Sequence, residues 1–231
     1  MSNIKEVCRL SCVSTSTVNR TLRNPDLVKP ETREKVMKAV KETGYRPNWM
    51  ATRFKRGKSN TIVVMVPNLL NPFFMQIIEG IEHGARQLGY NVLLGDSAGD
   101  PEIEHQYAAM ALNGRADGLI QLNHTFPFAA EDEELGLNVP MISVCDRITD
   151  HKFPFIELDN FGAARAMTQH LIELGHSKIG IISGQRKSQV YLDRLSGVIR
   201  ALSEEDILFN NDWLVGDGYS YNTGVEGIKE L

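Results

Sequence analysis

Side chains that can hydrogen-bond to a polar or charged partner are concentrated just after the first helical segment of the chain. Hydroxyls follow one another there, and an amide and a guanidinium come next: Ser14, Thr15, Ser16, Thr17, Asn19 and Arg20. Hydroxyl, amide and guanidinium groups are the ones that contact phosphates and base edges in protein–DNA complexes. The chemistry that these residues indicate is therefore the binding of a nucleic acid.

Residues that could support catalysis or hold a metal are scattered instead. An enzyme such as a nucleoside hydrolase needs clustered carboxylates or a Ser-His-Asp set at strand ends, whereas Asp96 and Asp159 stand alone. Cys8, Cys12 and Cys145 form no CxxC pair and have no histidine at zinc-ligand spacing. No GxGxxG follows the first predicted strand and no P-loop is present, so nucleotide phosphates are not indicated. We expect no enzymatic activity, no metal and no cofactor.

Charge divides the chain into two segments. Residues 1–58 contain 14 basic and five acidic side chains, a net charge of +9, and the rest contains 11 basic and 24 acidic ones, a net charge of −13. This asymmetry is typical of a nucleic-acid-binding module joined to a second domain. A solvated basic helix face would give the same charge, so the motifs must decide. We predict domains at residues 1–58 and 60–231, the second with subdomains at about 60–158 and 159–231.

Composition excludes other classes of protein. The 231 residues are 42% hydrophobic and 23% charged, which is ordinary for a globular protein. No apolar run approaches the roughly 18 residues that a membrane span needs, and the N-terminus lacks the apolar core of a signal peptide. We expect a cytoplasmic protein with no membrane partner.

The elements that position the hydroxyl-rich run are short helices. Residues 4–10 predict a helix with Val7 and Leu10 on one face, and Ser14 is a good N-cap for a second helix over residues 15–22. Two such helices joined by a short turn are a helix-turn-helix, whose second helix enters the major groove of DNA. Pro30 predicts the start of a third helix, which runs to about residue 43 and ends at Gly44.

These residues closely resemble the N-terminus of the LacI/GalR family of bacterial repressors. The resemblance covers the whole segment and rests on IKEV (4–7), VSTSTVNRTL (13–22), VKPETREKV (28–36) and GYRPN (44–48). It implies a dimeric repressor on the bacterial nucleoid that binds double-stranded operator DNA and reads bases through Thr15 and Ser16. It also implies a hinge helix over residues 48–55, with Phe54 wedged into a base step where the family usually has leucine. The full expected DNA-binding set is Ser14, Thr15, Ser16, Thr17, Asn19, Arg20, Asn24, Thr32, Ala51, Phe54 and Lys55.

The two expected base-reading side chains are short. Thr15 and Ser16 cannot make the bidentate base pairings of Arg, Asn or Gln, each worth roughly 1–3 kcal/mol of discrimination. We therefore predict modest base discrimination per half-site. Specificity should depend on the Phe54 wedge, DNA shape, phosphate contacts and a helper protein.

The acidic segment alternates strands with helices. Residues 61–66 form a β-branched run typical of a buried parallel strand. Helices and further strands follow in turn, with predicted helices starting after Asn71 and at about residues 102, 163 and 191. The first of these should bury a stripe that includes Phe74, Ile78 and Leu88. Such alternation predicts doubly wound parallel sheets, in which ligands bind beyond the carboxyl ends of the strands.

This segment also resembles the LacI/GalR effector domain, which is similar to periplasmic sugar-binding proteins. The resemblance rests on VPN (66–68), NPFF (71–74), ADGLI (116–120), DN (159–160), GHSKI (175–179) and RLSG (194–197). It implies a cleft between two subdomains that binds a small-molecule effector through Phe73, Phe74, His124, Asp146, Ser188, Val190 and Arg194. Phe74 also fits the apolar stripe of its helix, which leaves a core role open, and a surface arginine is the alternative for Arg194.

Two further expectations concern the effector. NPD (24–26), LLGD (93–96) and FPF (126–128) are most similar to a nucleoside-responsive branch of the family, although a sugar-like effector stays open. The chain ends at Leu231 inside a predicted helix, whereas family members extend further. We therefore expect these 231 residues to be C-terminally truncated and to bind effector weakly. The alternative function is a small-solute-binding protein without a DNA role.

Overall fold

A computed structural model of the chain describes residues 3–45, 58–149 and 152–231. These divide into two units, Met1–Gly57 and Lys58–Leu231, which we describe separately. The predicted hinge helix, with Ala51, Phe54 and Lys55, lies outside the described residues.

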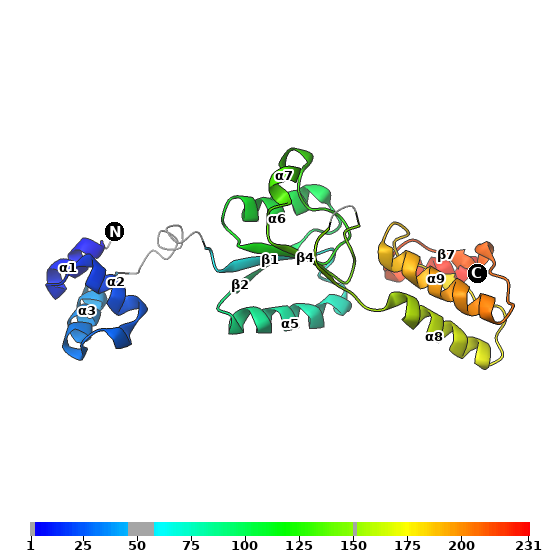
Figure 1. Ribbon diagram of the computed structural model, residues 1–231, viewed down its shortest axis with the longest axis horizontal. Helices are drawn as coiled ribbons and strands as arrows, with labels where there is room; N and C mark the ends of the chain where they lie inside the picture. Colours follow the sequence, from blue (N-terminus) through cyan, green and yellow to red (C-terminus); the bar gives the residue numbers. More distant parts are fainter. Residues whose placement is uncertain (1–2, 46–57, 150–151) are drawn as a thin grey trace. The chain divides into compact units, whose positions relative to one another are not determined.

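The described part of the first unit is helical (Figure 1). The side chain of Ser14 accepts a hydrogen bond from the backbone N–H of Thr17 at 3.3 Å, so it caps the second helix as predicted. Pro30 opens the third helix and Gly44, with a φ of 61°, ends it. The elements are α1 (Ile4–Ser11), α2 (Thr15–Arg23), the 3-10 turn η1 (Pro25–Leu27) and α3 (Pro30–Thr43).

A small apolar core holds these helices together. Val7, Val18 and Val36, one from each helix, are fully buried in one cluster. The prediction that Leu10 shares the inner face with Val7 is wrong, because Leu10 is 40% exposed. Ser11 is buried there instead, and its hydroxyl donates to the carbonyl of Val7 at 2.6 Å. The helix-turn-helix itself is confirmed.

A parallel sheet organises the start of the second unit. Its strand order is β2-β1-β3-β4-β5, and every adjacent pair is parallel. Because β2 and β3 flank β1, the chain changes direction across the sheet after β2. The elements are β1 (Thr61–Val66), α5 (Pro72–Gln87), β2 (Asn91–Asp96), α6 (Pro101–Leu112), β3 (Gly118–Gln121), the 3-10 turn η2 (Ala130–Asp132), α7 (Glu133–Gly136), β4 (Met141–Val144) and β5 (Phe155–Ile156).

The two faces of this sheet have separate apolar cores. Along β1, Met65 packs in a cluster with Ala108 of α6, whereas Val64 packs in a second cluster with Ile78 of α5. Figure 1 shows α5 on one side of the sheet and α6 and α7 on the other. Leu88, predicted to continue the buried stripe of α5, is 78% exposed because it lies beyond the last helical residue.

The rest of the second unit pairs two helices beside a second, two-stranded parallel sheet. At Gly197 the backbone of α9 comes so close to α8 that an added Cβ would lie 2.3 Å from the carbonyl oxygen of Phe161. This close approach aligns the start of α8 with the middle of α9. The elements are α8 (Asn160–Glu173), β6 (Ile181–Ile182), α9 (Gln189–Glu204), the 3-10 turn η3 (Asn211–Trp213), β7 (Leu214–Val215) and α10 (Tyr221–Glu230).

One carboxylate holds the first described residues of this unit. Oδ1 of Asp117 accepts hydrogen bonds from the backbone N–H and the hydroxyl of Ser59, at 2.5 and 2.9 Å. Its Oδ2 accepts one from the backbone N–H of Asn60 at 2.9 Å. Asp117 immediately precedes β3, so it fastens residues 59 and 60 to the amino-terminal edge of the sheet.

Candidate operator and effector sites

The start of α2 presents a row of hydroxyls. Ser14, Thr15 and Ser16 are exposed, and Thr17 is half-buried. The hydroxyl of Ser14 lies 2.8 Å from that of Ser16 and 3.0 Å from that of Thr17. Ser14 is thus committed to its cap, while Thr15 and Ser16 face solvent at the end of the helix that carries unpaired backbone N–H groups. Such a helix end attracts anions.

The other expected DNA-binding residues that the structure describes lie further along α2, at its C-cap and on α3. Arg20 and Asn24 are exposed, whereas Asn19 on α2 and Thr32 in the first turn of α3 are half-buried. The thiol of Cys8 on α1 lies 3.5 Å from the hydroxyl of Thr15, within hydrogen-bond distance. Sequence reasoning did not assign Cys8 any contact with the site.

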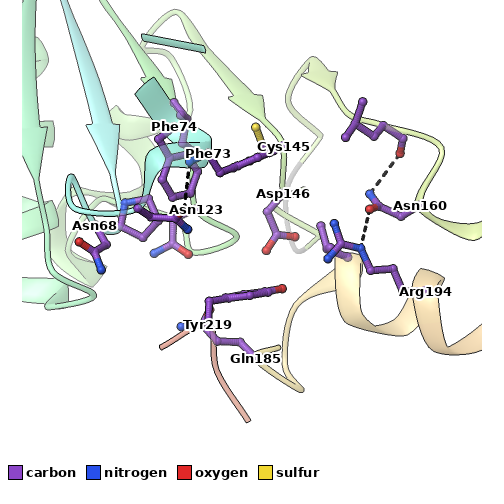
Figure 2. A pocket seen from close by; sticks show the side chains of 15 residues that line it. Asn68, Phe73, Phe74, Asn123, Cys145, Asp146, Asn160, Gln185, Arg194 and Tyr219 are labelled. Atoms are coloured by element: carbon purple, nitrogen blue, oxygen red, sulfur yellow. Dashed lines mark hydrogen bonds between the residues drawn. The ribbon is translucent and has the colours of Figure 1, made fainter. Parts of the chain in front are cut away.

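The second unit contains a pocket of about 450 Å³ at the carboxyl ends of its strands. Asn68 follows β1, Asn123 follows β3 and Asp146 follows β4, so three neighbouring strands supply its wall. This is the edge of the sheet where β1 and β3 are adjacent and the chain direction changes, which is where open α/β sheets bind ligands. Figure 2 shows these side chains converging with others from the region of α8, α9 and β7.

Aromatic rings form much of the apolar wall. Phe73 and Phe74 meet edge to face, with ring centroids 5.3 Å apart. Phe74 is 8% exposed, packs in the core beneath the pocket and also lines it, whereas Phe73 is 47% exposed. Tyr219, from the loop after β7, lies against Gly184, where an added Cβ would be 2.1 Å from its ring. A glycine at 184 is therefore needed for the observed place of Tyr219.

The polar wall is held in place from behind. Nδ1 of His124 lies 3.4 Å from a carboxylate oxygen of Asp146, and both side chains are largely buried. The interaction with Asp146 raises the pKa of His124, against the opposing effect of burial. Next to them the amide of Asn123 donates to buried Glu104 at 2.7 Å. The carboxylate of Asp146 also accepts from the backbone N–H of Arg147 at 3.0 Å, so a histidine outside the pocket and a backbone amide both contact it.

Cys145 follows β4 and precedes Asp146. Its backbone φ is 72°, a value that residues other than glycine rarely adopt. Burial, followed by the charge of Asp146, raises the pKa of its thiol to about 11. The thiol is therefore neutral at physiological pH and contributes a small, weakly polar surface to the pocket. Backbone strain of this kind gathers at ligand sites.

Five of the seven expected effector residues line one pocket: Phe73, Phe74, Asp146, Val190 and Arg194. His124 stands behind Asp146. Ser188 is buried and accepts a hydrogen bond from the backbone N–H of Tyr191 at 3.1 Å, so its hydroxyl caps α9. Sequence reasoning did not assign Tyr219 or Asn160 to the site. The DN pair at 159–160 was a signal for Asn160, whereas nothing local marked Tyr219.

The described residues contain neither a group of metal-ligating side chains nor a membrane-spanning helix. Within residues 3–45, 58–149 and 152–231, no three His, Cys, Asp or Glu side chains are grouped so as to hold a metal ion. No helix in those ranges is long and apolar enough to cross a lipid bilayer.

Known proteins match both units. Residues 3–48 match the model of bacterial regulatory proteins of the lacI family, and residues 59–230 match that of periplasmic binding proteins and the sugar-binding domain of the LacI family. The HTH-type transcriptional repressor CytR of Escherichia coli K12 is 34% identical over all of this chain and 67% of its own length. The ribose operon repressor of Haemophilus influenzae is also 34% identical, over all of this chain and 69% of its own.

Solved structures agree. A lac repressor dimer bound to operator and the anti-inducer ONPF superposes with a TM-score of 0.80 at 26% identity, covering 97% of this chain and 68% of that one. The matched relatives are DNA-binding transcriptional regulators. With one family model covering the helix-turn-helix and another covering most of the rest, this chain belongs to the LacI family of bacterial transcriptional repressors, with an effector-binding domain of the periplasmic-binding type.

Proposed function

We propose that this chain represses transcription as a homodimer and that a nucleoside bound in the 450 Å³ pocket controls its affinity for operator DNA. The observation that carries the proposal is the combination, in one chain, of a basic helix-turn-helix with exposed hydroxyls and an aromatic-walled pocket at the carboxyl edge of a parallel sheet. Effector binding changes the balance between two states of the dimer, which differ in operator affinity.

In this proposal residues 1–58 form the DNA-binding domain. Thr15 and Ser16 read base edges, and Arg20, Asn19, Asn24 and Thr32 contact the duplex around them. Support comes from the solvent exposure of Thr15, Ser16 and Arg20. Phe54, with Ala51 and Lys55, enters the minor groove and kinks the duplex, as apolar wedges do.

In this proposal residues 60–231 bind the effector, with subdomains at about 60–158 and 159–231. The rings of Phe73 and Phe74 offer a stacking surface for a base, while Asp146 and Arg194 supply an acceptor and donors for hydroxyls. The motifs that resemble a nucleoside-responsive branch of the family support a nucleoside, and the chain is 34% identical to CytR. A free sugar is the second candidate, supported by the equal similarity to a ribose operon repressor.

The same proposal gives the chain no catalytic activity and places it on the nucleoid in the cytoplasm. Support comes from the two isolated carboxylates. Asp96 accepts from the backbone N–H of Ala98 at 3.2 Å, and Asp159 caps α8 by accepting from Gly162 at 2.8 Å. Both are thus occupied by turn and cap hydrogen bonds. A solute-binding protein without a DNA role would have no need of a segment with charge +9.

The DNA-binding part is tested by selecting bound duplexes from a random pool at two salt concentrations, with wild type beside Phe54→Ala. We expect enrichment of a two-fold-symmetric sequence and weaker retention by Phe54→Ala. Binding that depends on salt but not on sequence would contradict a sequence-specific repressor.

The effector part is tested by NMR titration, which detects weak binding, with cytidine and with ribose as probes. We expect cytidine to shift resonances of pocket residues. Phe73→Ala should weaken cytidine binding roughly 5- to 150-fold, since a lost aromatic contact of this kind is worth roughly 1–3 kcal/mol. Leu70→Ala is the matched control, because Leu70 precedes α5 by two residues, is 90% exposed and does not line the pocket. Shifts with ribose alone would favour the sugar, and no shift with either would count against this effector class.

A further inference from the structure

Arg194 is held in the pocket by one buried amide. Its Nε–H donates to Oδ1 of Asn160 at 2.9 Å, and Nδ2 of Asn160 donates to the carbonyl of Leu158 at 3.1 Å. Asn160 is only 6% exposed, so this amide has little access to water. Figure 2 shows the two hydrogen bonds in series, from the Leu158 carbonyl through Asn160 to Arg194.

The orientation of the Asn160 amide is fixed by its two partners. Reversing it would set its oxygen against the carbonyl oxygen of Leu158 and its NH₂ group against the N–H of Arg194. Both contacts would then repel, because a carbonyl only accepts and a guanidinium only donates. The amide therefore has one stable arrangement, in which an acceptor faces Arg194.

The packing of α8 against α9 brings Asn160 and Arg194 close together. Asn160 is the first residue of α8, and Arg194 lies one helical turn before Gly197 on α9. Gly197 is where α9 approaches the Phe161 carbonyl closely enough to exclude a side chain. The helix crossing thus places the amide within hydrogen-bond distance of Nε.

We propose that Asn160 is a positioning residue for effector recognition: it engages Nε of Arg194 and so directs the two terminal nitrogens of the guanidinium into the pocket. This rests on the proposed role of Arg194 in binding the effector. A planar guanidinium fixed at Nε presents its terminal N–H groups as a rigid fork. Such a fork suits two adjacent acceptors on the ligand, such as neighbouring hydroxyls of a ribose ring.

Asn160 itself borders the pocket, and each end of its amide makes one hydrogen bond within the protein. If Asn160 acts by positioning, its effect on binding must pass through Arg194. That requirement separates positioning from a direct contact and from a general role in stability, and a double-mutant cycle measures it.

The first measurement needs no effector. Hydrogen exchange at arginine Nε–H groups is followed by ¹⁵N NMR in the full chain. We expect the Nε–H of Arg194 to exchange at least about tenfold more slowly than that of exposed Arg23, because it is hydrogen-bonded within the protein. Asn160→Leu should abolish the difference. Equal exchange in wild type and Asn160→Leu would overturn the proposal whether or not cytidine binds.

The second measurement is a cycle of cytidine affinities by NMR titration. We expect Asn160→Leu to weaken cytidine at least about tenfold, as loss of a hydrogen bond to a charged group does. In an Arg194→Gln background the same change should have no further effect. Independent, additive losses would overturn positioning through Arg194. Failure of wild type to bind cytidine would count against the nucleoside proposal, while the exchange measurement still decides the role of Asn160.

Thr168→Val is the matched control. Thr168 is buried on the same helix, and its hydroxyl donates only to the backbone of that helix, at the carbonyl of Ala164. It should leave both Arg194 exchange and cytidine affinity unchanged. If Asn160→Leu does not fold, Asn160→Ala replaces it in the cycle, because it also removes the acceptor for Nε of Arg194.

Discussion

At the scale of single residues, the side chains that line the pocket have partners far away along the chain. His124 contacts Asp146, Asn160 accepts a hydrogen bond from Arg194, and Gly184 leaves room for Tyr219. Residues of this kind are difficult to recognise in a sequence, because their partners lie far away along the chain. The RLSG motif (194–197) was enough to predict a role for Arg194. The DN pair (159–160) included Asn160 but did not indicate that its amide contacts Arg194.

The His124–Asp146 pair predicts a pH dependence. Asp146 raises the pKa of His124, with Glu104 adding to the rise and Lys187 opposing it. A histidine whose pKa is raised by folding stabilises the protein fully below its unfolded value of about 6.5. That contribution is lost as pH rises through the folded pKa. We therefore expect the free energy of unfolding of wild type to exceed that of Asp146→Asn most at acidic pH, with the difference shrinking towards pH 9.

Urea unfolding of both proteins from pH 5 to pH 9 measures this difference, and an NMR titration follows His124 directly. The pKa of His124 should fall in Asp146→Asn. Asp100→Asn removes the same charge at the N-cap of α6 and should leave the titration of His124 unchanged. An unaltered His124 pKa in Asp146→Asn would show that the pair does not couple.

At the scale of elements, boundaries set by local chemistry were predicted well. Ser14 and Pro30 start α2 and α3 where expected, and the β-branched run of β1 has the predicted bounds. Boundaries set by distant partners were not. One example is β6, where only Ile181 and Ile182 pair, with Leu214 and Val215. Neither that short pairing nor the resulting place of Tyr219 has a local signal in the sequence.

The crossing of α8 and α9 predicts an overpacking effect at Gly197. A Cβ there would lie 2.3 Å from the carbonyl oxygen of Phe161 and 3.0 Å from the backbone nitrogen of Arg165, and backbone atoms cannot move aside cheaply. We expect Gly197→Ala to lower the free energy of unfolding by about 1–3 kcal/mol. It should also lengthen the Asn160–Arg194 hydrogen bond, because the two helices must separate.

Denaturant unfolding measures the change, with Gly80→Ala as the matched control. Gly80 is also inside a helix, but nothing lies within 4 Å of its added Cβ. Alanine there should stabilise the protein by roughly 0.5–1 kcal/mol, because glycine is a poor helix former. Similar effects of both substitutions would mean that the α8–α9 contact is looser than described.

At the scale of the whole molecule, a basic DNA-binding unit and an acidic effector unit must communicate through the chain that joins them. The charge division of the sequence indicated two segments, but the motifs were needed to predict two domains, because a solvated basic helix face would give the same charge. How the second unit holds its first residues was not predictable, because Asp117 is 57 and 58 positions away from Asn60 and Ser59.

The position of Asp117 leads to a prediction: a substitution there should leave effector binding unchanged and alter the effect of the effector on operator affinity. Asp117 fastens residues 59 and 60 at the amino end of β3, whereas the pocket lies at the carboxyl ends of the strands. Asp117→Asn keeps one acceptor but turns an NH₂ group towards backbone N–H donors, so at least one hydrogen bond to a charged group is lost, at a cost of about 1.5–3 kcal/mol. We expect faster hydrogen exchange at the amides of Ser59 and Asn60, an unchanged cytidine titration and a smaller effect of cytidine on operator affinity.

Asp100→Asn again supplies the comparison, because it removes one carboxylate from an N-cap that asparagine fills equally well. If Asp117→Asn speeds exchange at residues 59 and 60 yet leaves the response of operator affinity to cytidine intact, the carboxylate anchors the chain without carrying the signal. If the response falls while cytidine still binds, the first turn of chain after the DNA-binding unit is where occupancy of the pocket reaches the DNA. Because the two variants carry the same net charge, long-range electrostatics cannot account for a difference between them.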